Sequence, residues 1–412
     1  MTVETSSTED RNIMAETRSD RDPLSLVIGA TAAQLIGGLV AQMSPFVVGG
    51  LMDGLSLSER GAGFVLTVEF LALAVAAMAI APALPRFSSR TVALVAVTLT
   101  LIAQCVSIFS ASWGSLLLLR GAAGVGEGIL WALSLSIIAS RSSNPDKVYG
   151  YFQIAWALVS IALFSIAGGV TAAFAHRGIL ALIAGVVFAL TPLLLFVPQA
   201  RTCVRAADET DAGGASLLLG TMTLTAIGLF LTAGAAVYSF SAPMGQRAGL
   251  DTHAIGYAFT VGHLFGLAGA VAATWLNVRI GRAIPITVSC AGFSLVVLVL
   301  CLWRDPAAYV SALLASITLY YFSTPYLLGL AAALDPSGRW AAAGGSVYLF
   351  GFAAGPLLAG SVIATGGYPG LAAVCVGLMV PVWALALVVN RRLHALNADA
   401  DEAIEIAEKI DI

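Results

Sequence analysis

Long apolar segments separated by short polar connections make up most of the sequence. Twelve of them approach or exceed the ~20 residues that a helix rising ~1.5 Å per residue needs to cross a bilayer. They are expected at 24–51, 62–84, 91–109, 116–139, 149–172, 179–198, 217–241, 255–277, 284–302, 307–334, 341–364 and 370–390. The pattern predicts an all-α integral membrane protein with twelve transmembrane helices.

Polar stretches divide this chain into five parts. Residues 1–23 form a polar tail without the apolar core of a signal peptide, so the first helix is expected to direct insertion. Residues 199–216 are polar and contain glycine, which predicts a linker between a six-helix bundle at 24–198 and another at 217–390. Residues 391–412 form a second polar tail, which from Ala398 onward is acidic and is expected to be solvated with a frayed helix.

Composition agrees with a membrane protein and excludes several other classes. Hydrophobic residues make up 59% of the chain, charged residues 10%, and the mean hydropathy is +0.92. Soluble domains carry about 25% charged residues. The net charge of −3 and the lack of a basic run give no indication of nucleic-acid binding. No P-loop, metal-ligand spacing or Ser/His/Asp constellation is present, so we expect no ATP drive, cofactor, metal or enzyme activity.

Positive charges predict the orientation, because Lys and Arg gather in cytoplasmic loops. With the N-terminus inside, the outer loops hold Arg60, Arg177, Arg247 and Arg304. The inner segments hold Arg11, Arg18, Arg21, Arg86, Arg90, Arg141, Lys147, Arg201, Arg205, Arg279, Arg282, Arg339, Arg391, Arg392 and Lys409. Both termini are therefore expected in the cytoplasm, and the chain in the cytoplasmic (inner) membrane.

An internal repeat relates the two halves. The segment that starts at Gly63 and contains Thr67 resembles the segment 193 residues later, which starts at Gly256 and contains Thr260. The same offset carries Arg86 onto Arg279. Two halves in the same orientation are related by an axis along the membrane normal.

Two charged residues lie within the apolar segment 116–139. Arg120 and Glu127 are seven residues apart, about 10.5 Å along nearly the same helical face. Each costs ~2.5–3.5 kcal/mol or more in lipid, so we expect both to face a protein or water-filled interior. Glu127, near the midplane, is our principal candidate proton carrier, with a structural ion pair as the alternative. Arg120 is expected to be its electrostatic partner or a clamp for a substrate anion, with snorkelling to the headgroups as the alternative.

Further candidates for the site are weaker. Glu69 and His263 occupy nearly repeat-related places and are expected in proton coupling or in the cavity, with buried hydrogen bonding as the alternative. A ligand cavity combines aromatic walls with a few polar groups. The candidates for it, each with core packing as the alternative, are Trp131, Gln153, Trp156, Tyr320, Thr324 and Tyr326. Gly124 and Gly128 form a G-x-x-x-G that predicts close helix approach.

Three motifs resemble the signatures of one transporter family, the major facilitator superfamily. The fourth-helix pattern R-x-x-x-G-x-G is present from Arg120 to Gly126. The cytoplasmic pattern G-x-L-x-D-R-x-G-R-R keeps Arg86 and Arg90 but has Pro85 in place of Asp, and the second half keeps Arg-x-Gly-Arg at Arg279–Arg282. The resemblance covers 24–390 and implies two six-helix bundles with a central cavity lined by the fourth helix. Arg86, Arg90, Arg279 and Arg282 are then expected to form gating salt bridges, with topology anchoring as the alternative.

These observations together favour a secondary active transporter. We expect it to move a small organic solute by proton-coupled alternating access, as a monomer in the lipid bilayer, and Arg120 favours an organic anion. Two alternatives stay open: a proton-antiport exporter of apolar or drug-like compounds, and a non-transporting membrane sensor on the same scaffold. The fifth-helix signature of drug/proton antiporters is absent, although a partial echo occurs at Gly351–Pro356.

Overall fold

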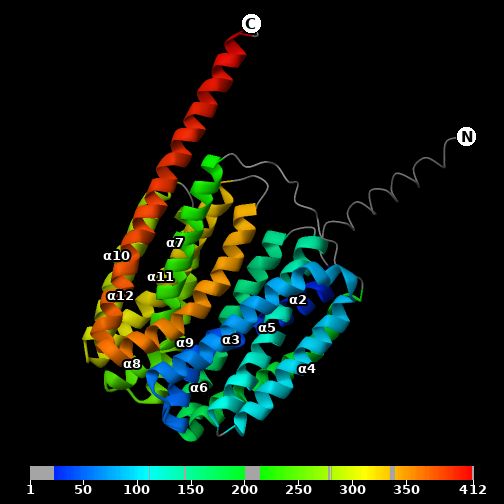
Figure 1. Cartoon of the computed structure of the whole chain (residues 1–412), viewed down its shortest axis with the longest axis vertical. Coiled ribbons are helices and arrows are strands. Elements are labelled where there is room, and N and C mark those ends of the chain that lie inside the picture. The colour runs from blue at the N-terminus through cyan, green and yellow to red at the C-terminus, as the bar shows by residue number, and fades with distance from the viewer. Residues whose placement is uncertain are drawn as a thin grey trace, which may run out of the picture.

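The computed structural model describes residues 23–110, 112–142, 145–199, 214–276, 279, 281–334 and 339–410 (Figure 1). Nearly all of the predicted N-terminal tail and most of the predicted linker lie outside the described residues. The described residues are helical almost throughout. The α-helices are α2 (Leu24–Leu55), α3 (Glu59–Ile80), α4 (Ser89–Ile108), α5 (Trp113–Arg141), α6 (Pro145–Leu190), α7 (Gly214–Ser239), α8 (Ser241–Arg247), α9 (Thr252–Leu276), α10 (Ala283–Leu302), α11 (Pro306–Ala332) and α12 (Arg339–Ile410).

Two of these helices are long enough to cross a bilayer twice. α6 has 46 residues and α12 has 72, and each is interrupted by one non-helical residue. These are Ala175, with φ 48°, and Gly367, with φ 64°. Positive φ reverses the chain direction locally and is normal for glycine but rare for alanine. Ten described helices are long and apolar enough to span a membrane, and division of α6 and α12 makes the structure compatible with twelve spans.

Prolines shorten two of the predicted helices. α3 and α6 pass into the 3₁₀ turns η1 (Ala81–Arg86) and η2 (Thr191–Phe196), which contain Pro82 and Pro192 near their starts. Proline lacks the N–H that an α-helix needs, which explains why the predicted helices 62–84 and 179–198 lose their last turns. The predicted tail at 391–412 is helical up to Ile410, because α12 continues through this stretch without Gly or Pro.

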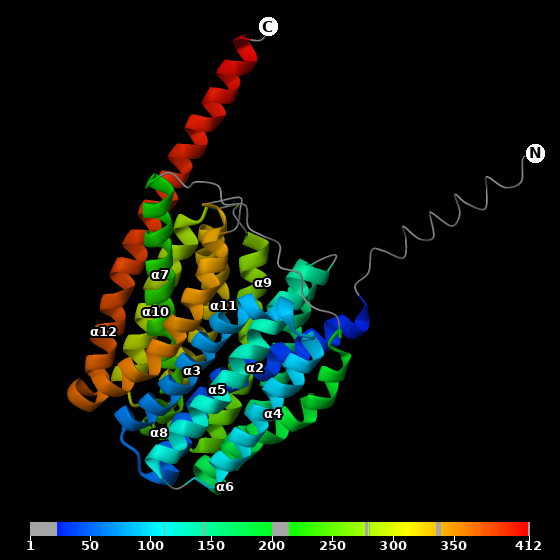
Figure 2. The ribbon, with the colours of Figure 1, turned by 45° about the vertical axis from the view of Figure 1, so that its right-hand side comes forward.

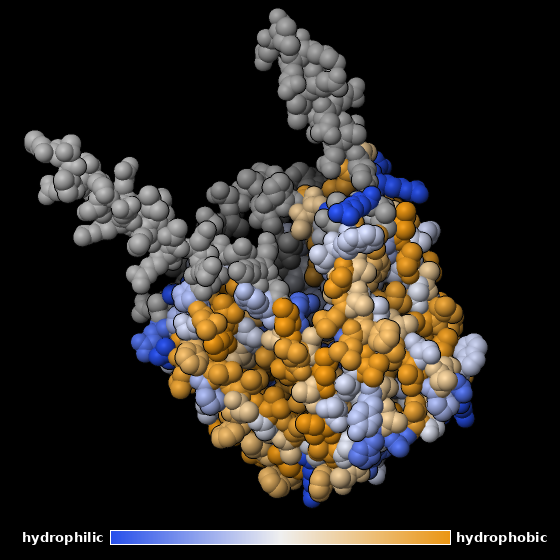
Figure 3. All heavy atoms as spheres, turned by 180° about the vertical axis from the view of Figure 1, so that it is seen from behind, coloured by the Kyte–Doolittle hydropathy of each residue, from blue (hydrophilic) through white to orange (hydrophobic). Residues whose placement is uncertain are grey.

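The helices form two bundles, α2–α6 and α7–α12 (Figures 1 and 2). Within the first bundle α5 contacts α2, α3 and α4, and within the second α12 contacts α7 and α10. The start of α2 and the last turns of α12 lie at one end of the molecule, here called the terminal end (Figure 1). The side of the molecule is covered mainly by apolar residues (Figure 3), as expected for a surface in contact with lipid.

Contacts between the bundles lie toward the end opposite the termini. α3 crosses α12, where Gly63 meets Pro356 and Gly360 meets Glu59. α6 crosses α9, where a Cβ on Gly256 would lie 2.8 Å from the Phe164 carbonyl oxygen. We call this region the closed seam, defined by Gly63, Gly168, Gly256, Pro356 and Gly360. The repeat-related residues Gly63 and Gly256 therefore perform the same task, because only glycine lets these backbones approach so closely.

Candidate functional site

Glycines of α5 bring three helices of the first bundle close together. Gly124 packs against the backbone carbonyl of Glu69 in α3, and Gly128 against that of Leu73. Gly126 packs against Thr100 in α4. The close approach predicted from G-x-x-x-G is confirmed, and its consequence is that polar side chains of α3, α4 and α5 come into contact.

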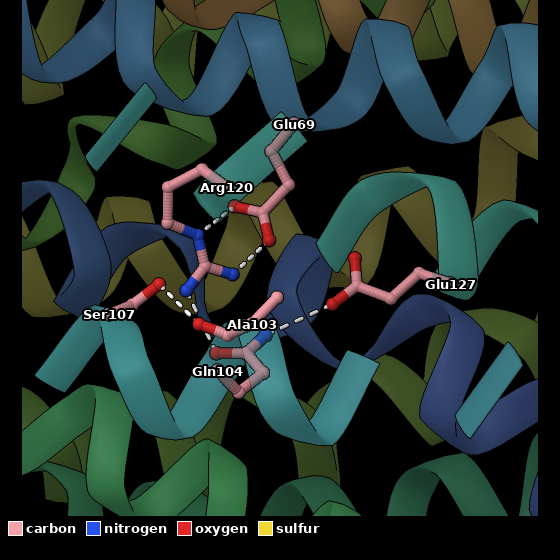
Figure 4. Close-up of polar contacts among 6 residues, drawn as sticks. All are labelled: Glu69, Ala103, Gln104, Ser107, Arg120 and Glu127. Carbon is pink, nitrogen blue, oxygen red and sulfur yellow. Dashed lines mark hydrogen bonds and ion pairs between the residues drawn. The ribbon is translucent and has the colours of Figure 1, made fainter. Parts of the chain in front are cut away.

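These side chains form a buried network of four residues, the carboxylate network: Glu69, Gln104, Arg120 and Glu127 (Figure 4). Arg120 donates through Nε to Glu69 Oε2 at 2.9 Å and pairs through Nη2 with Glu69 Oε1. Its Nη1 donates to Gln104 Oε1 at 2.8 Å, and Gln104 Nε2 donates to Glu127 Oε1 at 3.1 Å. Glu69 and Arg120 are 0% exposed and Glu127 is 1% exposed. The network is therefore sealed from both lipid and water.

The structure changes the expected pairing. Arg120 forms its two-point ion pair with Glu69 instead of Glu127, because the glycine contacts hold α3 beside α5. Of the two expected surroundings for Arg120 and Glu127, a protein interior or a water-filled one, the structure shows the protein interior in this conformation, since neighbouring helices enclose both residues. Snorkelling of Arg120 is excluded by the same burial. Gln104, which joins the two carboxylates through its amide, was not predicted; its signal was one amide within a 20-residue apolar helix.

Glu127 is less well satisfied than Glu69. Its Oε2 is buried without a hydrogen-bond partner in the described part of the chain. Glu69 receives two hydrogen bonds from a guanidinium, whereas Glu127 receives one from a neutral amide. A buried carboxylate without a cation partner costs several kcal/mol. The two acids are therefore not equivalent.

A second polar cluster joins the two bundles. Gln42 Nε2 in α2 lies 2.8 Å from Ser160 Oγ in α6 and 2.6 Å from His263 Nε2 in α9. His263 Nδ1 lies 2.9 Å from the Phe259 carbonyl oxygen, which can only accept. Nδ1 therefore carries the proton, and Nε2 of a neutral ring accepts from Gln42. The structure places His263 at the bundle junction, apart from the carboxylate network.

The six predicted cavity residues differ in their exposure and in their contacts. Trp131 and Trp156 are partly exposed and meet at Gly38, and the Tyr320 hydroxyl contacts that of Tyr348. Tyr326, by contrast, is 5% exposed and donates to the Ala273 carbonyl within the second bundle. The other two, Gln153 and Thr324, are an exposed side chain on α6 and a hydroxyl that bonds its own helix.

The four arginines of the predicted gate lie in or beside the connections between helices at the terminal end. Arg90 Nε donates to the Val197 carbonyl at 2.9 Å within the first bundle. Arg279 lies 6.0 Å from the Trp275 ring centroid, Arg86 is exposed, and Arg282 precedes α10. Within the described residues none of them forms an ion pair. Their gating role stays a prediction.

One hydroxyl of the first bundle enters a helix of the second at the closed seam. Thr67 Oγ1 donates to the Ala353 carbonyl at 2.9 Å and accepts from Leu357 N–H at 3.0 Å. In an unbroken helix Leu357 N–H would bond to Ala353 directly, but Pro356 opens this turn. Thr67 thus replaces the missing backbone hydrogen bond of α12 with two bonds from the first bundle, and it can do so only while the seam is closed.

Similar proteins share this architecture. The structure of a bacterial homolog of the human lysosomal transporter Spinster, in an inward-facing and unoccupied conformation, is 13% identical, with TM-score 0.63, over 90% of this chain and 97% of that one. The nucleoside transporter NupG is 13% identical, with TM-score 0.66, over 89% of this chain and 97% of that one. No curated protein sequence matches.

These similar structures show the fold, and a match to a sequence family shows to which family the chain is related. The family model described as Major Facilitator Superfamily matches residues 30–344, which include the carboxylate network and the bundle junction. Together with the ten long apolar helices found among the described residues, this match makes the chain a multi-pass membrane protein of a transporter family. The chain belongs to the Major Facilitator Superfamily.

Proposed function

We propose that the protein is a proton-coupled secondary transporter of a small organic solute, with Glu127 as the proton carrier. The observation that carries the proposal is the position of Glu127: it is 1% exposed, one of its oxygens lacks a partner, and Gln104 links it to the Arg120–Glu69 pair. A buried acid without a cation partner is favoured in its neutral, protonated form, and water that reaches it favours the ionised form.

Charge balance supports this role. The network holds two carboxylates and one guanidinium, which is committed to Glu69 by two contacts. With Glu127 neutral the network carries no net charge, and with Glu127 ionised it carries one negative charge in a site without water. The sealed network is therefore expected to hold a proton on Glu127. A state of the transport cycle in which water reaches the network would hydrate Glu127 and let it exchange its proton.

The arrangement of the bundles fits alternating access. The closed seam joins the bundles toward one end, and the described basic residues Arg86, Arg90, Arg141, Arg279, Arg282, Arg391 and Arg392 lie toward the other. Because positive charges favour the cytoplasm, we assign the terminal end to the cytoplasm of an inner membrane. The conformation is then closed toward the outside. Because one chain holds both bundles and the network, we propose a monomer as the working unit.

Proteoliposomes test the proposal. Vesicles that contain the full chain and a pH-sensitive dye are exposed to carboxylates, sugars, hydrophobic cations and neutral amides in turn. A solute that acidifies the lumen on entry indicates proton symport, and one that makes it alkaline indicates the antiport alternative. Glu127→Gln is expected to lose the pH change and the uptake driven by an imposed pH gradient, yet to retain exchange of labelled solute. Glu59→Gln, at the partly exposed start of α3, is the matched control.

Two results would contradict the proposal. If Glu127→Gln accumulates the solute to the level of the parent, Glu127 is not the proton carrier. Failure of every solute to move, in exchange as well as under a gradient, would favour the non-transporting sensor.

A further inference from the structure

Partly exposed aromatic side chains lie between the bundles on the terminal side of the Gln42–His263 contact. We call Trp131, Trp156, Tyr320, Tyr321 and Tyr348 the aromatic face. A Cβ on Gly38, one turn before Gln42, would lie 2.7 Å from the Trp156 ring and 2.9 Å from the Trp131 ring. Both tryptophans therefore border the same part of α2.

The second bundle contributes tyrosines to this face. The Tyr321 ring lies 6.5 Å from the His263 ring and 5.8 Å from the Tyr320 ring, each edge to face. The hydroxyl of Tyr320 contacts that of Tyr348. Through His263, which contacts Gln42, these tyrosines are connected to the tryptophan side.

The exposure of the aromatic side chains differs on the two sides of the Gln42–His263 contact. Toward the closed seam, Phe46, Phe164 and Phe259 pack ring against ring and are at most 1% exposed. The five residues of the aromatic face are only partly buried. The Gln42–His263 contact therefore separates the buried phenylalanine cluster from the partly exposed aromatic face.

Several uncharged hydrogen-bonding groups of this region have no protein partner. In the part of the chain that the structure describes, the Tyr321 hydroxyl and the indole N–H groups of Trp131 and Trp156 make no hydrogen bond, nor does Gln42 Oε1. Three of the four can donate. A ligand that offers acceptor atoms would satisfy these three donors, and Gln42 Oε1 is left to accept from a donor.

Within the described residues, no charged side chain forms a hydrogen bond or ion pair with the aromatic face. The ionisable residues of the first bundle lie either in the enclosed carboxylate network or near the helix ends, as Asp53, Arg90, Arg141 and His176 do, and His263 has the hydrogen-bond pattern of a neutral ring. A charged solute would lose hydration at this face without gaining a partner. A neutral solute would not.

We propose that the aromatic face binds an uncharged solute with an aromatic ring and hydrogen-bond acceptors, the ring lying against Trp131 and Trp156 and an acceptor facing Tyr321. Stacking on indole and phenol rings favours a flat ring over a saturated one. This inference rests on the proposed transport function and names its substrate class. It also favours a neutral solute over the organic anion that Arg120 suggested from the sequence, because Arg120 is committed to Glu69.

Matched ligands separate charge from shape in an equilibrium binding experiment on the purified full chain. The probes are benzamide, nicotinamide and indole-3-acetamide. Each is compared with the carboxylate and with the positively charged aminoalkyl compound that carry the same ring, and cyclohexanecarboxamide is the saturated amide. Calorimetry and thermal unfolding report binding. At least one aromatic amide is expected to bind tenfold or more tightly than its acid, its amine and the saturated amide. Equal or tighter binding of acids or amines, equal binding of the saturated amide, or no binding of any amide at millimolar concentration would overturn the proposal.

Substitutions then locate the site. Tyr321→Phe removes one hydroxyl and is expected to weaken binding of the best amide about fivefold, and Trp156→Leu removes stacking and should weaken it tenfold or more. Tyr257→Phe and Trp303→Leu change side chains that are 60% and 56% exposed on the outer surface and should bind as the parent does. Parent-like binding by Tyr321→Phe and Trp156→Leu would contradict this placement.

The two proposals fail separately. Binding is measured without a pH gradient, so loss of proton coupling would leave the binding result intact. Conversely, tight binding of an anion would refute the neutral substrate class while Glu127 could still carry the proton.

Discussion

Thr67→Val removes one hydroxyl from the closed seam and keeps the shape of the side chain. In the parent this hydroxyl bridges the Ala353 carbonyl and the Leu357 N–H across the turn of α12 that Pro356 opens. Valine fills the same volume but cannot bond to either group. Because Thr67 and α12 belong to different bundles, the loss is confined to the conformation in which the seam is closed.

The size of the effect follows from the two hydrogen bonds. Each contributes about 0.5–1.5 kcal/mol net, and a buried peptide group left unpaired costs about 1–3 kcal/mol. When the seam parts, water can reach Ala353 and Leu357, so the parted state loses little. Thr67→Val should therefore shift the balance toward the parted state by about 1–3 kcal/mol, or roughly 5- to 150-fold.

Distances between spin labels would measure this shift. Labels on Arg60→Cys and Thr365→Cys, both exposed at the end opposite the termini, report the separation of the bundles in a background without the native cysteines. The parent should show mainly a short distance and Thr67→Val an added longer one, whereas Thr67→Ser should resemble the parent.

The repeat supplies the control for this experiment. Thr260, the repeat-related residue, donates at 3.0 Å to the Gly256 carbonyl of its own helix, so Thr260→Val should leave the distances unchanged. Identical distance distributions for Thr67→Val and the parent, or equal shifts in both valine variants, would refute the reasoning.

Three further predictions concern the first bundle. Glu69→Gln leaves Arg120 buried without its carboxylate partner and should lower the free energy of unfolding by about 3–5 kcal/mol, seen as a lower thermal midpoint in detergent; a midpoint equal to the parent's would show that the pair is not closed. Gly128→Ala places a Cβ against a backbone carbonyl of α3 and should lower the thermal midpoint, whereas Gly185→Ala, with open space around it, should be neutral or slightly stabilising; the reverse order would contradict the packing. Arg90→Gln loses the hydrogen bond to the end of the sixth span and should destabilise the protein by about 1 kcal/mol, measured by chemical denaturation, without abolishing solute exchange.

Most of the fold could be predicted from the hydrophobic pattern of the sequence. Apolar segments of bilayer length must be helical, because every peptide group has to be bonded within its own segment in lipid. The Gly63–Gly256 repeat added the two-bundle plan, and the positive charges added a predicted orientation. The pattern placed the ends less well, because Pro82 and Pro192 convert the last turns to 3₁₀ geometry.

Part of the site was also readable from composition. Arg120, Glu127 and Glu69 are conspicuous because ionisable groups are costly in an apolar helix, and Gly124 and Gly128 indicated where a neighbouring helix comes close. Gln104 and Gln42 were not singled out, since a neutral amide in a membrane helix is a weak signal.

Sequence by itself thus determined that the chain spans the membrane many times, in two related halves, with charged groups held inside. Tertiary structure alone decided which acid takes the arginine, because Glu69 and Arg120 are far apart in the chain and meet only where glycines let α3 and α5 touch. It likewise decided that His263 meets Gln42 and that Thr67 enters the opened turn of α12. Burial cost can be calculated for one residue at a time, but the choice of partner depends on which helices pack together, and that is a property of the whole chain.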